Sequence, residues 1–220
     1  NGALALHHVP AGNNVNLGYY SGAGVHCSFL LMEDGDYHPR RVYFGTDSIN
    51  TVSGINTSGT VNFNDWMNAR SGALTNAVYF TAAEGGTVEF ACNIIGNSSN
   101  SVVKIGAGTV RMKSGGANSG DRAYTGSTTV RAGTLVAAAD ANGTANSGGG
   151  CLGFNDKTVQ LADSLTQTSD TPALLTEGTS RLVTHPIQVN PYGATRTIGA
   201  VDGGSPVFSG NVYLASAAQL

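Results

Sequence analysis

Residues 103–136 read VKIGAGTVRMKSGGANSGDRAYTGSTTVRAGTLV, and this stretch carries the pattern that decides the fold. Apolar and polar residues alternate in short runs, most clearly at residues 109–112. Alternation with a period of two is typical of half-buried strands, and glycine clusters between such runs are typical of tight turns. The stretch therefore predicts short strands separated by corners.

The same pattern continues on both sides of this stretch. Further strand-like runs lie at residues 15–17, 29–32, 41–44, 60–63, 77–80, 87–90 and 158–161. The Ala-rich run 135–141 is the best helix candidate, but Gly133 and Gly143 bracket it, so we expect a strand that runs into a loop. The alternation predicts that the following residues are buried: Val61, Phe63, Val78, Phe80, Val88, Phe90, Val110, Met112, Val130, Leu135, Val159, Leu161, Ile187 and Val189.

Long-range repetition distinguishes between the possible all-β architectures. Residues 1–66 resemble residues 145–212; for example, Val-Asn-Leu at 15–17 recurs as Val-Gln-Leu at 159–161, a shift of 144. A β-helix coil takes about 20 to 25 residues, so such a unit would contain several coils. Asn-Gly and Asp-Gly hairpin signals are scarce, which disfavours a sandwich or barrel. We expect residues 1–220 to be a single section of a right-handed parallel β-helix with about nine or ten coils.

Composition excludes several classes of protein. Charged residues make up 11% of the chain and the formal net charge is −3, so nothing favours nucleic acid binding. The sequence contains no window of about 20 apolar residues, so it predicts no membrane-spanning segment. No signal peptide is visible at Asn1, so we expect an interior or mature fragment. Cys27, Cys92 and Cys151 form no CxxC pair, and small buried side chains are a better interpretation than zinc ligands, although one disulfide stays open.

The stretch 103–136 resembles the passenger-associated transport repeat, also called the autotransporter-associated β-strand repeat. The residues that carry the resemblance are Lys104, Gly106, Gly108, Thr109, Val110, Met112, Gly115, Asn118, Tyr124, Thr125, Gly126, Thr128, Thr129, Val130, Ala132, Gly133, Thr134 and Leu135. One departure is the segment 119–123, which separates Asn118 from Tyr124 and predicts a longer surface loop. The resemblance implies a scaffold in a bacterial extracellular or cell-surface protein whose repeats help the passenger to fold, and it implies no chemistry.

Few residues suggest catalysis or ligand binding. The densest polar cluster contains Glu33, Asp34, Asp36 and His38, but it lacks the spacing of a known calcium loop. The remaining candidates, for which surface or core positions are the better interpretation, are His7, His8, Arg40, Arg41, Tyr19, Tyr20 and Trp66. We therefore predict no catalytic residue, no metal ligand and no cofactor site.

The sequence predicts a structural role as a stalk, fibre, matrix or adhesin passenger rather than an enzyme. Two alternatives stay open, a carbohydrate-active β-helix enzyme such as a polysaccharide lyase or glycoside hydrolase, and a glycan-binding adhesin. The expected partners are further coils of the same chain or like subunits in a filament, and surface glycans. An open β-helix has unpaired strand edges at its ends, which favours stacking of this kind.

Overall fold

The computed structural model describes most of the chain. Its backbone is described at residues 2–6, 14–17, 26–31, 35–37, 41–44, 49–57, 59–63, 66–69, 77–90, 94–96, 101–113, 126–141, 150–153 and 156–215. Side-chain burial is described mainly from residue 51 onward, outside residues 61–76 and 91–100 and the other gaps. Within these residues the secondary structure is all β, and no helix is long and apolar enough to cross a membrane.

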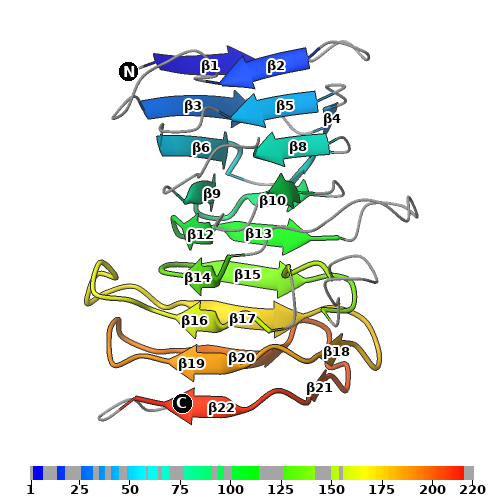
Figure 1. Cartoon of the computed structure of the whole chain (residues 1–220), viewed down its shortest axis with the longest axis vertical. Helices are drawn as coiled ribbons and strands as arrows, with labels where there is room; N and C mark the ends of the chain where they lie inside the picture. The colour runs from blue at the N-terminus through cyan, green and yellow to red at the C-terminus, as the bar shows by residue number, and fades with distance from the viewer. Residues whose placement is uncertain are drawn as a thin grey trace.

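Four parallel sheets run along the molecule (Figure 1). The first contains β1 (Gly2–Leu6), β3 (His26–Leu31), β6 (Ile49–Gly54), β9 (Val78–Ala82), β12 (Val102–Ile105), β14 (Thr128–Val130), β16 (Val159–Leu161), β19 (Ile187–Val189) and β22 (Val212–Leu214). The second contains β4 (Gly35–Tyr37), β7 (Thr60–Phe63), β10 (Thr87–Phe90), β13 (Thr109–Met112), β15 (Thr134–Ala137), β17 (Ala173–Thr176) and β20 (Thr197–Ala200). The third contains β2 (Asn14–Leu17), β5 (Arg41–Phe44), β8 (Trp66–Ala69) and β11 (Ile94–Gly96), and the fourth pairs β18 (Leu182–Val183) with β21 (Val207–Phe208).

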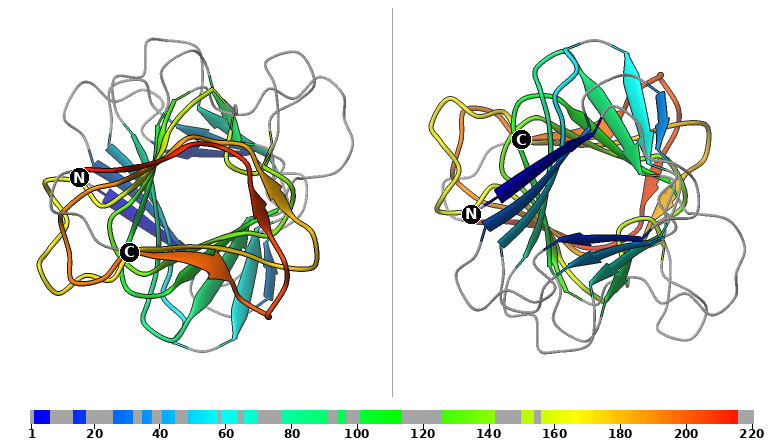
Figure 2. Two further views of the ribbon diagram at one scale, coloured as in Figure 1. Left: turned by 90° about the horizontal axis from the view of Figure 1, so that it is seen from below. Right: turned by 90° about the horizontal axis from the view of Figure 1, so that it is seen from above.

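The chain visits these sheets in a fixed order, and each return to the first sheet adds a turn. One turn runs through β3, β4 and β5, and the next through β6, β7 and β8. Partners in the first sheet are 23 to 31 residues apart, as the pairs Cys27↔Asn50 and Thr128↔Val159 show. Seen along its axis, the molecule is a ring of strands around a central core (Figure 2). The predicted parallel β-solenoid is thus confirmed.

The predicted number of nine or ten coils is not supported. Only the first sheet has nine strands, while the second has seven, the third four and the fourth two. Among the described residues, five turns carry a strand on all three faces, namely those that begin at β3, β6, β9, β16 and β19. The prediction divided the chain by a fixed coil length, but a solenoid face tolerates loops in place of strands.

The core lies inside the ring and consists of apolar columns that run from turn to turn. All the residues predicted to be buried whose side chains are described are less than 9% exposed, while the side chains of Val61 and Phe63 lie outside the described set. The rings of Phe80 and Phe90, from two different sheets, lie 4.4 Å apart between centroids and close the centre of one turn. Burial of such a side chain contributes about 1.5–3 kcal/mol. The Ala-rich run behaves as expected, since β15 ends at Ala137 and leads into a loop.

Candidate functional site

Of the residues that the sequence singled out for chemistry, the described structure brings Arg41 and Trp66 side by side, as register partners in neighbouring strands. Asp36 lies in β4, Arg41 in β5 and Trp66 in β8, each known by its backbone alone. The other candidates lie outside the described residues: His7, His8, Tyr19, Tyr20, Glu33, Asp34, His38 and Arg40. Among described residues no group of three or more His, Cys, Asp or Glu side chains could hold a metal ion. The buried lysine, the ion pairs and the exposed apolar residues of the described structure lie instead at the corners, on the faces and at the end of the coil.

Lys104 is the unexpected residue of the coil, because its charged side chain points into the core. Its position pairs with Phe80 in the preceding turn and Val130 in the following turn, and both of these are fully buried. The side chain of Lys104 is itself 0% exposed. Its Nζ atom donates three hydrogen bonds, at 2.9, 2.7 and 2.9 Å, to the carbonyl oxygens of Ile105, Gly106 and Ala132.

The three acceptors come from two successive corners of the coil. Ile105 and Gly106 lie where β12 leads into β13, and Ala132 lies where β14 leads into β15. Burial lowers the pKa of Lys104 to about 7, and the charge of Asp170 opposes this shift. Three carbonyl acceptors match the three donors of an ammonium group, so the geometry favours the charged form. The lysine thereby links the corners of two turns.

These corners are built from a recurring Gly-Thr pair. Such pairs lie at residues 59–60, 86–87, 108–109 and 133–134. In each of them the threonine is the first residue of a strand of the second sheet, and the glycine directly precedes that strand. The backbone N–H groups of Thr87, Thr109 and Thr134 donate to the glycine carbonyls one turn earlier, at 3.3, 3.0 and 3.2 Å. Two of these pairs lie inside the stretch 103–136 and two lie before it, so the corners expected from the sequence recur in the earlier turns.

The corner between β14 and β15 is packed backbone against backbone. Gly133 has a φ of +63°, and a Cβ atom there would lie 2.5 to 2.7 Å from the carbonyl oxygens of residues 106–108. A side chain disfavours positive φ, and at such distances the backbone itself would have to move. Glycine at this position is therefore a requirement of close stacking between the two turns.

An ion-pair cluster crosses several turns on the outer face of the second sheet. Arg111 forms salt bridges with Glu89 in the preceding turn and with Glu177 two turns further on, and Lys113 also binds Glu89 at 2.6 Å. Partial burial lowers the pKa of Arg111, but the hydrogen bonds and charges of Glu177 and Glu89 outweigh it and hold the pKa above its ordinary value. We call these four residues the Arg111 clasp.

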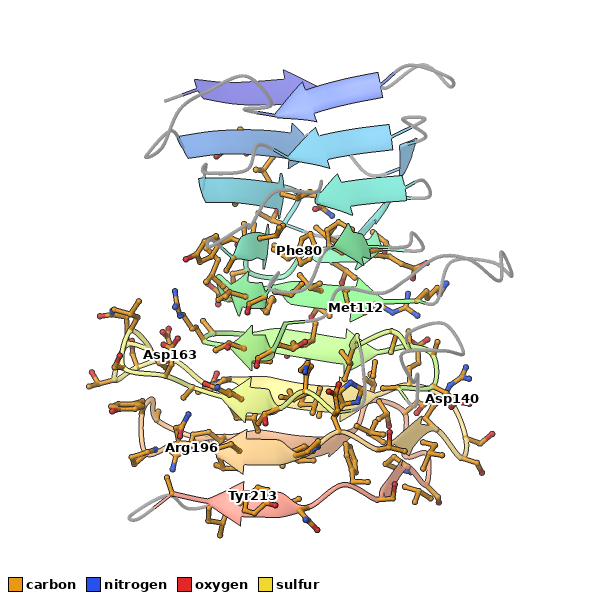
Figure 3. The ribbon with its side chains drawn as sticks, viewed as in Figure 1. Phe80, Met112, Asp140, Asp163, Arg196 and Tyr213 are labelled. Atoms are coloured by element: carbon orange, nitrogen blue, oxygen red, sulfur yellow. The ribbon has the colours of Figure 1, made fainter. Side chains whose placement is uncertain are left out.

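Two neighbouring loops replace the tight corner in later turns. They span residues 162–172 and 190–196 and project from the coil (Figures 1 and 2). The Ala194 N–H donates to the Asp170 carbonyl at 2.7 Å, which joins the loops. Asp163 anchors the first loop, because its carboxylate accepts from Arg131 at 2.7 Å. Figure 3 labels Asp163 above Arg196, the last residue of the second loop.

The third face of the later turns buries two titratable side chains. His185 is 1% exposed, and its Nδ1 lies 3.0 Å from the Ala141 carbonyl oxygen. Burial lowers the pKa of His185 despite nearby backbone hydrogen bonds. Burial also raises the pKa of the Cys151 thiol to about 12, and this cysteine is free. Burial thus favours the uncharged imidazole of His185 and the protonated thiol of Cys151 near neutral pH, so both side chains have the character of core residues.

The described carboxylates are mostly engaged in holding the coil together. Glu89 and Glu177 belong to the Arg111 clasp, and Asp163 pairs with Arg131. Four further carboxylates bind a backbone N–H or a neighbouring cation: Asp140, Asp156, Asp170 and Asp202. Paired carboxylates of a glycosidase must instead face a substrate across a fixed gap. Among described residues these seven carboxylates make contacts within the coil itself.

The last described turn leaves core positions uncovered. Val212 and Leu214 of β22 pair with Ile187 and Val189, which are fully buried, so all four belong to the inward columns. Nevertheless Val212 is 43% and Leu214 is 53% exposed, because no described strand lies beyond β22 (Figure 3 labels Tyr213 between them). The surface formed by β20, β21 and β22, with the exposed Val201 and Val207, is named the open end below.

The stacked corners, the apolar columns and the scaffold-like charges define a repeat protein of the parallel β-solenoid class. Residues 102–137 match the model of the passenger-associated-transport-repeat family. The match spans β12 to β15, about one sixth of the chain, and confirms the repeat expected at 103–136. No curated protein and no solved structure gave a match in the corresponding comparisons.

Proposed function

We propose that this chain is a structural section of a bacterial surface or secreted passenger, in which the solenoid acts as a stalk, fibre or adhesin scaffold. The observation that carries the proposal is the passenger-associated transport repeat at residues 102–137, embedded in a parallel solenoid. The repeat describes passengers and not an enzyme family, which favours a scaffold over catalysis. A right-handed coil is part of the proposal, since about 98% of parallel crossovers have that hand.

The open end supports the expected partner, a further turn of the same kind of coil. Unpaired strand edges and exposed inward residues together form a template for another strand with alternating apolar residues. Val212 and Leu214 would lie under the next apolar pair of the column. We propose that more of the same chain, or a like subunit in a filament, covers this end.

Ultracentrifugation of the chain tests the open end. Aspartate at both Val212 and Leu214 places charges where apolar stacking is required, so self-association should fall compared with the unmodified chain. Aspartate at the outward-facing position of Tyr213 is the matched control and should change association less. A chain that stays monomeric at high concentration contradicts stacking through this end.

A surface-display experiment tests the passenger role. The chain is placed between a signal peptide and an outer-membrane translocator barrel, and intact cells are treated with external protease. We expect the chain to reach the surface and its stacked strands to resist cleavage, because their backbone is hydrogen-bonded from turn to turn and buried, so that nicking is confined to loops. Retention of the chain inside the cell, or rapid degradation of a displayed chain, contradicts the proposal.

A surface glycan is a second candidate partner, favoured by the two projecting loops. Leu165 of the first loop is 62% exposed and Tyr192 of the second is 42% exposed. An exposed aromatic ring suits stacking on a sugar. A glycan array with the unmodified chain and Tyr192→Ala tests it: binding that disappears with the variant supports an adhesin, and an empty array favours a plain scaffold.

A further inference from the structure

We propose that residues 102–137 form a two-turn folding nucleus, and that Lys104 is the positioning residue that sets the register of the second turn on the first. The inference stands on the geometry of the coil and does not depend on where the protein is located. It assigns a physical role to the lysine that lies within the matched repeat.

Apolar columns by themselves define the stacking of turns weakly. The inward column that contains Lys104 also contains Phe80, Val130, Leu161 and Val189, one from each of four other turns. Any of these side chains packs acceptably against any other, so a turn stacked on the wrong neighbour would still bury apolar surface. Repeat proteins are exposed to such misassembly because each turn resembles the next.

Lys104 distinguishes the native stacking from these alternatives. Its three donors are all accepted only when the Ala132 carbonyl of the next turn lies over the Ile105–Gly106 corner. In a wrong register the buried amine would lack one or more of its acceptors, and an unsatisfied buried polar group destabilises that arrangement. A buried polar group of this kind trades stability for a unique arrangement.

Two independent contacts strengthen the same pair of turns. Gly133 lies against the carbonyl oxygens of residues 106–108, so this corner stacks closely on the corner one turn earlier. The Arg131 N–H also donates to the Lys104 carbonyl at 2.9 Å, next to the buried ammonium. The Lys104–Ala132 contact closes a loop of 28 residues, which lies within the range of 23 to 31 residues that separates partners in the first sheet.

The matched segment contains every group of this arrangement. Lys104, its three acceptors and Gly133 all lie between residues 102 and 137. One copy of the repeat therefore supplies a complete pair of interlocked turns. The neighbouring turns then add to its two faces, and the Arg111 clasp fastens a turn on either side through Glu89 and Glu177.

Folding kinetics of the full chain with Lys104→Met test the proposal. Methionine fits the apolar column. If the buried lysine only destabilised the native state, Lys104→Met would be more stable than the unmodified chain and would refold at least as fast. The nucleus predicts refolding at least tenfold slower, measured by far-UV circular dichroism after dilution from urea, with the unfolding rate changed less than twofold. Lys157→Met, at a partly exposed surface lysine, is the matched control and should leave both rates unchanged. Refolding of Lys104→Met at the unmodified rate overturns the proposal.

Native-state hydrogen exchange of the unmodified chain covers the case in which the variant does not fold. The N–H groups of Arg131 and Thr134, which bond to the preceding corner, should be among the last to exchange as urea is added. The Val159 N–H, which bonds to the Pro186 carbonyl at 2.8 Å, provides the comparison in an interior turn outside the nucleus. Exchange of Arg131 and Thr134 before Val159 would overturn a nucleus at residues 102–137.

Discussion

Gly133→Ala should destabilise the coil far more than an ordinary surface substitution. The backbone φ of +63° costs an alanine about 1–2 kcal/mol. Its Cβ would also lie 2.5 to 2.7 Å from three carbonyl oxygens, so the corner must open. Opening weakens the bonds from Thr134 N–H to the Gly108 carbonyl and from Ala173 N–H to the Gly133 carbonyl, each worth about 1 kcal/mol. The total is about 3–4 kcal/mol.

Gly203→Ala is the matched control for this substitution. Gly203 has a similar φ of +69°, but a Cβ atom there would meet nothing within 4 Å. It should therefore cost only the conformational strain, about 1–2 kcal/mol. The difference between the two variants, about 2 kcal/mol, isolates the contribution of corner stacking.

Equilibrium unfolding in urea, followed by far-UV circular dichroism, measures both variants. The midpoint should move further for Gly133→Ala than for Gly203→Ala, while the dependence on urea concentration stays the same. Equal shifts would refute the reasoning, because they would mean that the corners of adjacent turns do not support one another.

The other predictions concern charges and pH. Arg111→Gln should cost about 1–2 kcal/mol, measured by urea unfolding, because it leaves buried Glu89 with fewer partners, whereas Lys157→Gln should cost little. Since burial lowers the pKa of His185, the unfolded chain takes up its proton first, and stability should fall below about pH 6.5; His185→Gln should flatten that slope. Since burial raises the pKa of Cys151 to about 12, the contribution of this thiol to stability should decline as the pH rises above 9.0, so the stability of the unmodified chain relative to Cys151→Ala should fall over that range.

The alternation of residues was enough to predict the core and the strands. Val110 and Met112 are inward because every second residue of a strand faces the same side, and the scarcity of hairpin signals predicted parallel pairing. The alternation could not place Lys104. In Val102-Val103-Lys104-Ile105 it favours an inward Val103 and Ile105, yet the acceptors that stabilise an inward lysine include a carbonyl 28 residues away.

Contacts between distant turns were also beyond the reach of sequence reasoning. Arg111 and Glu177 are 66 residues apart, and their distance depends on the lengths of every loop between them. The strands of the third face could not be predicted from the sequence either, because a solenoid closes a turn with either a strand or a loop of variable length. In the turn that begins at β14 the described part of the third face contributes no named strand but two isolated bridges, from Ala141 to Val183 and from Gly150 to Gly153.

The internal similarity at a shift of about 144 residues stays a prediction, but the positions of its segments give it a geometric meaning. β2 lies in the third sheet and its counterpart β16 in the first. Residues 29–31 of β3, in the first sheet, resemble residues 173–175 of β17, in the second. Residues 59–63, which include β7 of the second sheet, resemble residues 204–208, which include β21, and the sheet of β21 follows the second in the order of the turn. Each counterpart is thus moved on by one face, so the unit is not a whole number of turns. Successive copies would present equivalent residues a third of a turn apart, and a binding surface repeated with them would wind around the rod instead of forming a straight line.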